Sequence, residues 1–134
     1  MKTSFAILCL ILSAMINAQN ETETTNHEEV FTIVDEMPSF PGGEMQLIKF
    51  FRTNLKYPLR EKAAHISGCC FITFVVEKDG SIQNIKILEG VTGGAGCDQE
   101  VIRVANLMPV WNPGKHHGKT VRTQFNLPVK FILY

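Results

Sequence analysis

Charge of one sign is what this sequence has little of. Its 13 Lys and Arg residues balance its 13 Asp and Glu residues, so the formal net charge at pH 7 is zero. An excess of charge is what draws a protein to nucleic acid or to an anionic membrane surface, so neither partner is indicated. The charges are nevertheless separated along the chain. Residues 19–36 contain six acids and no Lys or Arg, which predicts an acidic N-terminal segment ahead of a basic folded part.

The sequence also lacks an apolar run of the roughly 20 residues that a membrane-spanning helix needs. An almost unbroken apolar run, residues 5–16, follows Lys2 and precedes Ala18, which is typical of a cleavable export signal. We predict a signal peptide over residues 1–18, cleavage after Ala18 and a periplasmic protein. Ile16 fits the cleavage motif poorly, so an uncleaved inner-membrane anchor facing the periplasm remains the alternative.

Cysteines are few, and the mature chain would keep an odd number: Cys69, Cys70 and Cys97. In an oxidising compartment at least one of them lacks an intramolecular partner. Successive residues of a strand point to opposite faces, so Cys69 and Cys70 should not both reach Cys97. One internal disulfide and a buried, unpaired Cys70 are the two alternatives.

The chain divides into a signal peptide, a flexible acidic tether over residues 19–36 and one folded domain over residues 37–134. The tether is polar and lacks apolar periodicity. Within it, residues 30–34 are β-prone and could add a minor strand. Two later segments have apolar residues at helical spacing. The first predicted helix begins at Glu44, and its apolar residues are Leu47, Ile48, Phe51 and Leu55. The second ends at Pro109, and its apolar residues are Val101, Val104, Ala105 and Met108. A short helical turn over residues 59–64 follows Pro58.

Three segments show the alternation of strands. The first two, residues 68–76 and 82–88, flank an Asp79-Gly80 turn and predict a hairpin. Ile82 falls on the opposite face from Ile85 and Ile87, which indicates a bulge. We expect Trp111 to pack over the domain edge, and residues 112–118 to form a loop.

The last segment has the clearest alternation in the chain. One face contains Val121, Thr123, Phe125, Leu127, Val129, Phe131 and Leu133, and the other Arg122, Gln124, Asn126 and Lys130. Pro128 cannot donate to a strand ladder, which predicts an edge strand. The fold class is therefore α+β: two helices packed on a three-stranded antiparallel sheet.

No group of residues calls for catalysis. Gly90, Gly93, Gly94 and Gly96 precede a helix, but no Lys-Ser/Thr pair follows them as in a phosphate-binding loop. His116 and His117 lack a nearby ligand set for a metal. A Cys97 nucleophile with a His65 base has no surrounding signature, and the Asp98 and Glu100 carboxylates suit a helix N-terminus. We predict a protein that is not an enzyme and has no metal, cofactor or small-molecule substrate.

An exposed, alternating edge strand is a template for another extended chain. Such an edge can accept a partner peptide as an added strand. The alternatives are an ordinary protected edge and a homodimer formed through it. The residues alone do not separate these readings.

The chain resembles the TonB C-terminal domain family over residues 37–134. The shared landmarks are Phe40-Pro-Gly-Gly43, Tyr57-Pro58-Leu-Arg60, Gly68, Val76 through Asp79-Gly80, Ile85 to Leu88, and Met108 to Lys115. The resemblance implies the fold above and a periplasmic module that binds the TonB-box peptides of outer-membrane TonB-dependent transporters beside the last strand. The implied partner-binding residues are Thr123, Gln124, Phe125, Asn126, Leu127, Val129, Lys130 and Phe131, with Tyr57, Pro58 and Arg60 near the partner's plug domain.

The N-terminal half departs from the family pattern. Full transducers have an inner-membrane anchor and a long spacer, whereas residues 19–37 reach only about 60 Å at roughly 3.3 Å per residue. Binding can therefore be retained where energy coupling is lost. The alternative function is a structural or envelope-interaction module that dimerises through its edge strand or binds cell-wall material.

Overall fold

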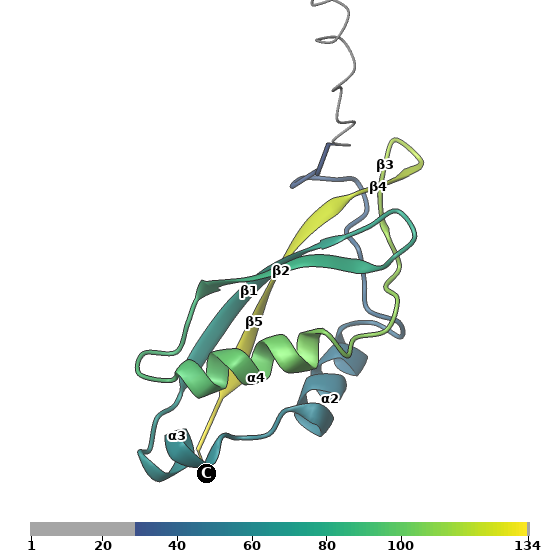
Figure 1. Cartoon of the computed structure of the whole chain (residues 1–134). Helices are drawn as coiled ribbons and strands as arrows, with labels where there is room; N and C mark the ends of the chain where they lie inside the picture. Colours follow the sequence, from purple (N-terminus) through teal and green to yellow (C-terminus); the bar gives the residue numbers. More distant parts are fainter. Residues whose placement is uncertain (1–28, 134) are drawn as a thin grey trace, which may run out of the picture.

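The computed structural model describes residues 29–133, which form three helices and two antiparallel sheets (Figure 1). The elements are, in chain order, α2 (Glu44–Asn54), α3 (Leu59–Ala63), β1 (Gly68–Val76), β2 (Ile82–Glu89), α4 (Ala95–Ala105), β3 (Gly114–His116), β4 (Lys119–Val121) and β5 (Thr123–Phe131). The larger sheet has the strand order β2-β1-β5, and β3 pairs only with β4. The expected α+β fold class is confirmed, since helices pack on a three-stranded antiparallel sheet.

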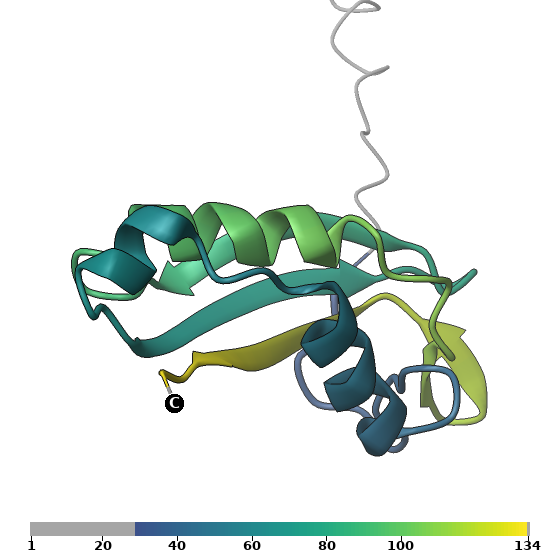
Figure 2. The same ribbon diagram turned by 90° about the horizontal axis from the view of Figure 1, so that it is seen from below.

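Strand β1 is the centre of the sheet and of the core. Its residues Cys70, Ile72, Phe74 and Val76 are all at most 1% exposed, because they lie on the face that the helices cover. Figure 2 shows α3 and α4 together over this face. The opposite face has no such cover at Phe71, which is 39% exposed. The alternation predicted for this strand is thereby confirmed.

The β1–β2 hairpin contains the predicted bulge. Its register shifts twice, between Phe71 and Ile72 and between Thr73 and Val75. Asn84 adopts a left-handed conformation with φ 55°, a conformation that Asn tolerates better than most residues. The extra residue lets both Ile82 and Ile85 pack against the core, although simple alternation would separate them.

Helix α4 is joined to α3 and to the loop before it by two carboxylates. Buried Glu61 accepts a hydrogen bond from the Gly96 amide at 2.9 Å. Asp98 accepts one from the Val91 amide, also at 2.9 Å. The Gly96 amide lies in the first turn of α4, where backbone N–H groups lack helical partners, and the Val91 amide lies in the loop before the helix. Glu100, which we expected to serve the same helix end, instead binds Arg103 and the Lys56 amide.

Trp111 lies in the core, and the expectation that it packs over the domain edge is wrong. It is 2% exposed and contacts the rings of Phe40, Phe74 and Phe125 at centroid distances of 5.7, 5.2 and 5.1 Å. The physical reason is a non-local contact: Ser39 and Asn112 form an antiparallel bridge, which places Phe40 beside the indole. Ile48 is a second correction, since it is 43% exposed whereas Leu47 and Phe51 are buried.

Residues 114–121 form the β3–β4 hairpin, although we expected a loop over residues 112–118 and placed Val121 in the last strand. His117 and Gly118 have φ angles of 52° and 76°, as in the two-residue turn that joins twisted antiparallel strands. Gly118 adopts such an angle without strain, and it is the residue that permits the turn.

The three cysteines of the described chain, Cys69, Cys70 and Cys97, are free thiols. The unpaired alternative therefore describes this structure. Among residues 29–133 no helix has the length and apolar character needed to cross a membrane. The predicted signal peptide lies outside the described residues.

Candidate strand-addition edge

Strand β5 occupies one edge of the sheet, as its proline predicted. It pairs with β1 along all nine residues, from Thr123 opposite Val76 to Phe131 opposite Gly68, without a register shift. Figure 1 shows β5 as the yellow strand that runs the length of the sheet. A straight, regular strand of this kind presents evenly spaced backbone groups on its second side.

The outward backbone groups of β5 belong to its even-numbered residues. The Gln124 amide donates to the Phe31 carbonyl at 2.9 Å, on the side away from β1. Backbone groups of successive residues point alternately to the two sides of a strand, so those of Asn126, Pro128 and Lys130 point the same way as those of Gln124. Within the described chain, no residue pairs with this outward side beyond Gln124. The open part of the edge is therefore residues 126–131.

Pro128 lies at an outward position. Pro128 lies opposite Phe71 of β1, but its backbone nitrogen points away from β1. The β1–β5 pairing therefore requires no N–H at this position, and the sheet tolerates the proline. Its missing donor affects only a strand that adds from outside. Pro128 thus interrupts the outward donors between Asn126 and Lys130 while it leaves a carbonyl acceptor in place.

The side chains of β5 divide as predicted. Val129 and Phe131 are buried in the core, and Thr123 is buried beside Gly114 of β3, while Phe125 and Leu127 are partly buried against the core. Gln124 and Lys130 lie on the sheet face that the helices leave uncovered, and the side-chain amide of Gln124 (Nε2) donates to the Thr73 hydroxyl at 3.1 Å. Strand β5 contains no acidic residue. An added strand would therefore meet Lys130 without a competing carboxylate from β5.

The Tyr57 segment reaches the end of β5. The Tyr57 ring lies edge-on to Phe131 at 5.4 Å, and its hydroxyl donates to the Ile66 carbonyl. Desolvation raises the pKa of Tyr57. Pro58 is the N-cap of α3, and Arg60 is exposed on that helix. The structure thus places Tyr57 against the C-terminal end of the strand, with Pro58 and Arg60 next along the chain.

Phe31 is the residue that sequence reasoning did not connect to this site. Its amide donates to the Arg122 carbonyl at 2.8 Å, which makes a parallel bridge with Thr123. The β-prone stretch of residues 30–34 signalled a minor strand but gave no information on its partner. The bridge covers the first residues of the β5 edge.

The candidate reactive groups remain apart. Cys97 is fully buried, and burial raises the pKa of its thiol to about 11, whereas His65 is exposed on the α3–β1 connection. His116 and His117 both face Asp35, with Nδ1 to carboxylate distances of 3.6 and 4.0 Å. Over residues 29–133 no group of three or more His, Cys, Asp and Glu side chains is placed to hold a metal ion.

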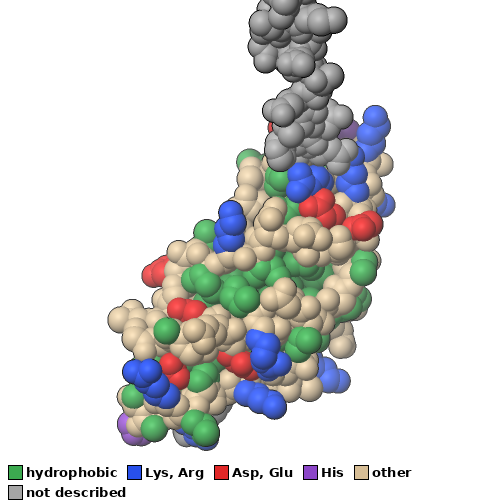
Figure 3. All heavy atoms as spheres, viewed as in Figure 1, with side chains coloured by type: hydrophobic (Ala, Val, Ile, Leu, Met, Phe, Trp, Pro, Cys, Tyr) green, Lys and Arg blue, Asp and Glu red, His purple; other side chains and the backbone are tan. Residues whose placement is uncertain are grey.

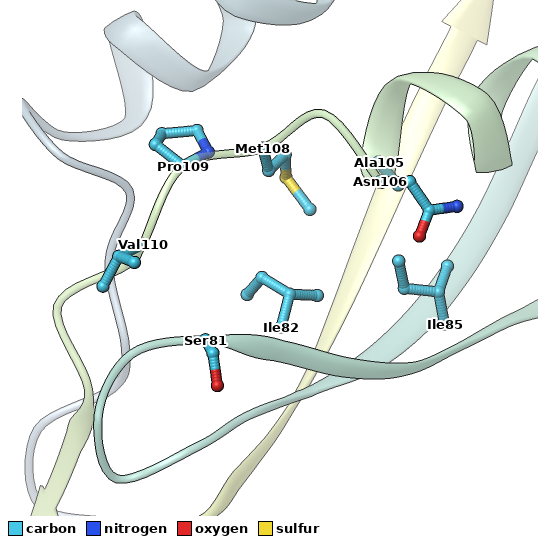
Figure 4. Close-up of a pocket in the computed structure, with 8 residues that line it drawn as sticks. All are labelled: Ser81, Ile82, Ile85, Ala105, Asn106, Met108, Pro109 and Val110. Carbon is cyan, nitrogen blue, oxygen red and sulfur yellow. The ribbon is translucent and has the colours of Figure 1, made fainter.

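The other sheet edge, β2, lies beside an apolar hollow of about 150 Å³. Figure 4 shows Ile82 of β2 and Met108 pointing toward each other across it. Hydrophobic side chains gather at the centre of this face in Figure 3. The bulges of β2 distort its backbone beside the hollow, so this edge is a poor template for an added strand.

These features define a small α+β domain with one regular edge strand whose outward groups are open over part of its length. The family model described as Gram-negative bacterial TonB protein C-terminal matches residues 53–133, and the chain belongs to this family. Domains of this family interact with outer-membrane transporters, and membership implies a location in the bacterial envelope.

Solved structures similar to this chain include two NMR structures of the Helicobacter pylori TonB C-terminal domain. The longer form has 19% identity and a TM-score of 0.47, and the match covers 67% of this chain and 79% of the other. The shorter form has 19% identity and a TM-score of 0.43, with 66% and 90% covered. No curated protein matches the chain in sequence.

Proposed function

We propose that this protein docks on the TonB-box peptides of outer-membrane TonB-dependent transporters by adding the peptide as a strand beside β5. The observation that carries the proposal is the open outward side of residues 126–131, in a strand that keeps its register over nine residues. Main-chain hydrogen bonds give such a complex its affinity, and alternate side chains give it selectivity. The role is a periplasmic binding module in transport across the outer membrane.

The surroundings of β5 favour an extended peptide with an acidic residue near the end of the strand. Lys130 lies on the open face, and Arg60 is exposed on α3, which follows the Tyr57 segment. Long-range attraction of this kind increases the association rate more than the affinity. The interface is small, so the expected dissociation constant is about micromolar.

Strand addition is tested by comparing the affinities of peptides that differ only in which backbone N–H groups can donate hydrogen bonds. A TonB-box peptide from a transporter of the source bacterium is labelled and titrated by fluorescence anisotropy. It is then N-methylated at alternate residues, in two complementary sets. A peptide that adds as a strand uses the donors of only one set, because its own groups also alternate.

The expected result is that one methylated set loses binding by more than about tenfold, at roughly 1 kcal/mol for each hydrogen bond, while the other set binds normally. Equal loss in both sets, or none in either, would contradict strand addition. A concentration-dependent dimer that shows no peptide response would instead favour the envelope-interaction module that dimerises through this edge.

A further inference from the structure

The N-terminal part of the described chain occupies part of the surface that the proposed partner would use. Phe31 forms two backbone hydrogen bonds at the edge of β5: its amide donates to Arg122, and its carbonyl accepts from Gln124, at 2.8 and 2.9 Å. The bridge is parallel to β5. The first outward position of the strand is therefore already filled by the protein itself.

Residues 35–39, which follow Phe31 in the chain, are held by more hydrogen bonds than Phe31 itself. Glu36 and Lys115 exchange two backbone hydrogen bonds of 2.9 Å, and Ser39 and Asn112 exchange two more, at 3.0 and 2.8 Å. The Asp35 carboxylate accepts from the His117 amide at 2.8 Å. Residues 35–39 are therefore fixed to the β3–β4 hairpin and to the residues just before β3.

Phe31 itself is attached through one bridge. Its ring is half-buried and contacts the His116 ring at a centroid distance of 5.5 Å. Between the bridge and the anchor, Ile33 is 83% exposed, so little packing holds this stretch down. The segment thus has a fixed base at residues 35–39 and a single bridge at residue 31, and a contact with so little packing around it opens at low free-energy cost.

We propose that residues 31–34 form an autoinhibitory strap, in which Phe31 competes with the incoming partner strand for the edge of β5. When the strap is closed, the partner strand can pair only with residues 126–131 of β5. When the strap is open, the partner strand can also pair with the outward backbone groups of Gln124. This inference rests on the proposed function and adds a regulation to the same site. A partner strand that pairs with the whole length of β5 must displace Phe31.

The test is the substitution Phe31→Pro in the full chain, which removes the amide that donates to Arg122. Ile33→Pro is the matched control, because it introduces the same residue into the same strap but leaves both atoms of the bridge in place. Phe31→Ala is a second variant that keeps the bridge and removes the ring contact with His116. Two readouts are taken: hydrogen exchange of the Gln124 amide, and affinity for the labelled TonB-box peptide.

In Phe31→Pro we expect the Gln124 amide to exchange as fast as that of Asn126, and the peptide to bind about tenfold more tightly, since the gained hydrogen bonds contribute roughly 1 kcal/mol each. Ile33→Pro should match the wild type in both readouts, and Phe31→Ala should lie between. Persistent protection of Gln124 in Phe31→Pro would overturn the strap.

The two proposals fail in different ways. Fast exchange of Gln124 with unchanged peptide affinity would overturn the competition and leave strand addition intact. If no variant binds the peptide, strand addition fails, and the competition fails with it.

Discussion

The two edges of the sheet differ in regularity, and the difference explains which of them is the better backbone template for an added strand. Strand β5 pairs with β1 through nine consecutive residues without interruption, whereas β2 shifts register twice and contains left-handed Asn84. Bulges and charges protect an exposed edge from unwanted pairing, and β2 also has Lys86 opposite Thr73. An apolar hollow beside β2 therefore does not make it a strand-addition site. Strand β5, which keeps its register over its whole length, is the better backbone template.

Hydrogen exchange should give the largest difference along β5. The amides of Leu127 and Val129 point to β1, and those of Asn126 and Lys130 point outward, by the alternation that starts at Gln124. We expect the inward amides to exchange at least about a hundredfold more slowly. The measurement is amide exchange by NMR in dilute protein. Slow exchange of Asn126 and Lys130 would mean that another strand, such as that of a second copy, already covers the edge.

A core substitution under β5 should reduce stability more than one under β2. Phe125 contacts the rings of Phe74 and Trp111 at 5.6 and 5.1 Å, so Phe125→Ala should lower the free energy of unfolding by about 3 kcal/mol. Ile87→Ala on β2, at a residue 37% exposed, should lower it by less than about 1 kcal/mol. Urea denaturation measures both. Equal losses would show that the two edges are anchored alike.

Asn84 tests whether the distortion of β2 is built into the sequence. At its φ of 55°, the conformational energy of alanine is roughly 1 kcal/mol less favourable than that of asparagine or glycine. Asn84→Ala should therefore destabilise the protein by about that amount, while Asn84→Gly should be nearly neutral. Denaturation curves of the two variants separate the backbone effect from loss of the side chain. An Asn84→Ala variant as stable as wild type would argue against the bulge.

Pro128 should limit the affinity of β5. Pro128→Ala adds an N–H on the outward side of the strand and leaves the pairing with Phe71 unchanged. One further hydrogen bond of about 1 kcal/mol corresponds to roughly fivefold tighter peptide binding. Peptide titration measures this change, with Gln83→Ala on β2 as the control that should have no effect. Weaker binding by Pro128→Ala would contradict the proposed direction of the strand's donors.

The smallest effect concerns Asp35, in the base that anchors the strap. The hydrogen bond from the His117 amide lowers the pKa of the Asp35 carboxyl from its ordinary value, so the charged form is favoured in the fold. A lowered pKa stabilises the protein above the unfolded value, and this stabilisation is lost as the pH falls through the folded value. Asp35→Asn should therefore reduce the pH dependence of stability slightly below pH 4. An identical acid titration of stability in wild type and variant would contradict this.

Local patterns predicted most of the fold. The spacing of Leu47 and Phe51 identified α2, and the alternation along residues 68–76 and 123–131 identified both faces of the central and edge strands. The last strand is shorter than the predicted 121–133, because Val121 pairs in β4 and β5 ends at Phe131. These elements were predictable because neighbours in sequence determine which face is buried. Pro128 likewise placed β5 at an edge, where the structure has it.

The misses share a physical cause, which is contact between segments far apart in sequence. Trp111 is buried because the Ser39–Asn112 bridge brings Phe40 over it, and no periodicity near Trp111 reports that bridge. The β3–β4 hairpin is too short and polar for an alternation signal. Phe31 reaches β5 through a single parallel bridge, which has no sequence pattern of its own.

The measurement that tests the central claim most directly is an NMR titration of the labelled full chain with the TonB-box peptide. Strand addition predicts that the amides of Asn126 and Lys130 shift and become protected from exchange, while those of β2 remain unchanged. Perturbation centred on the hollow beside Ile82 and Met108, or no perturbation of β5 at saturating peptide, would contradict the account.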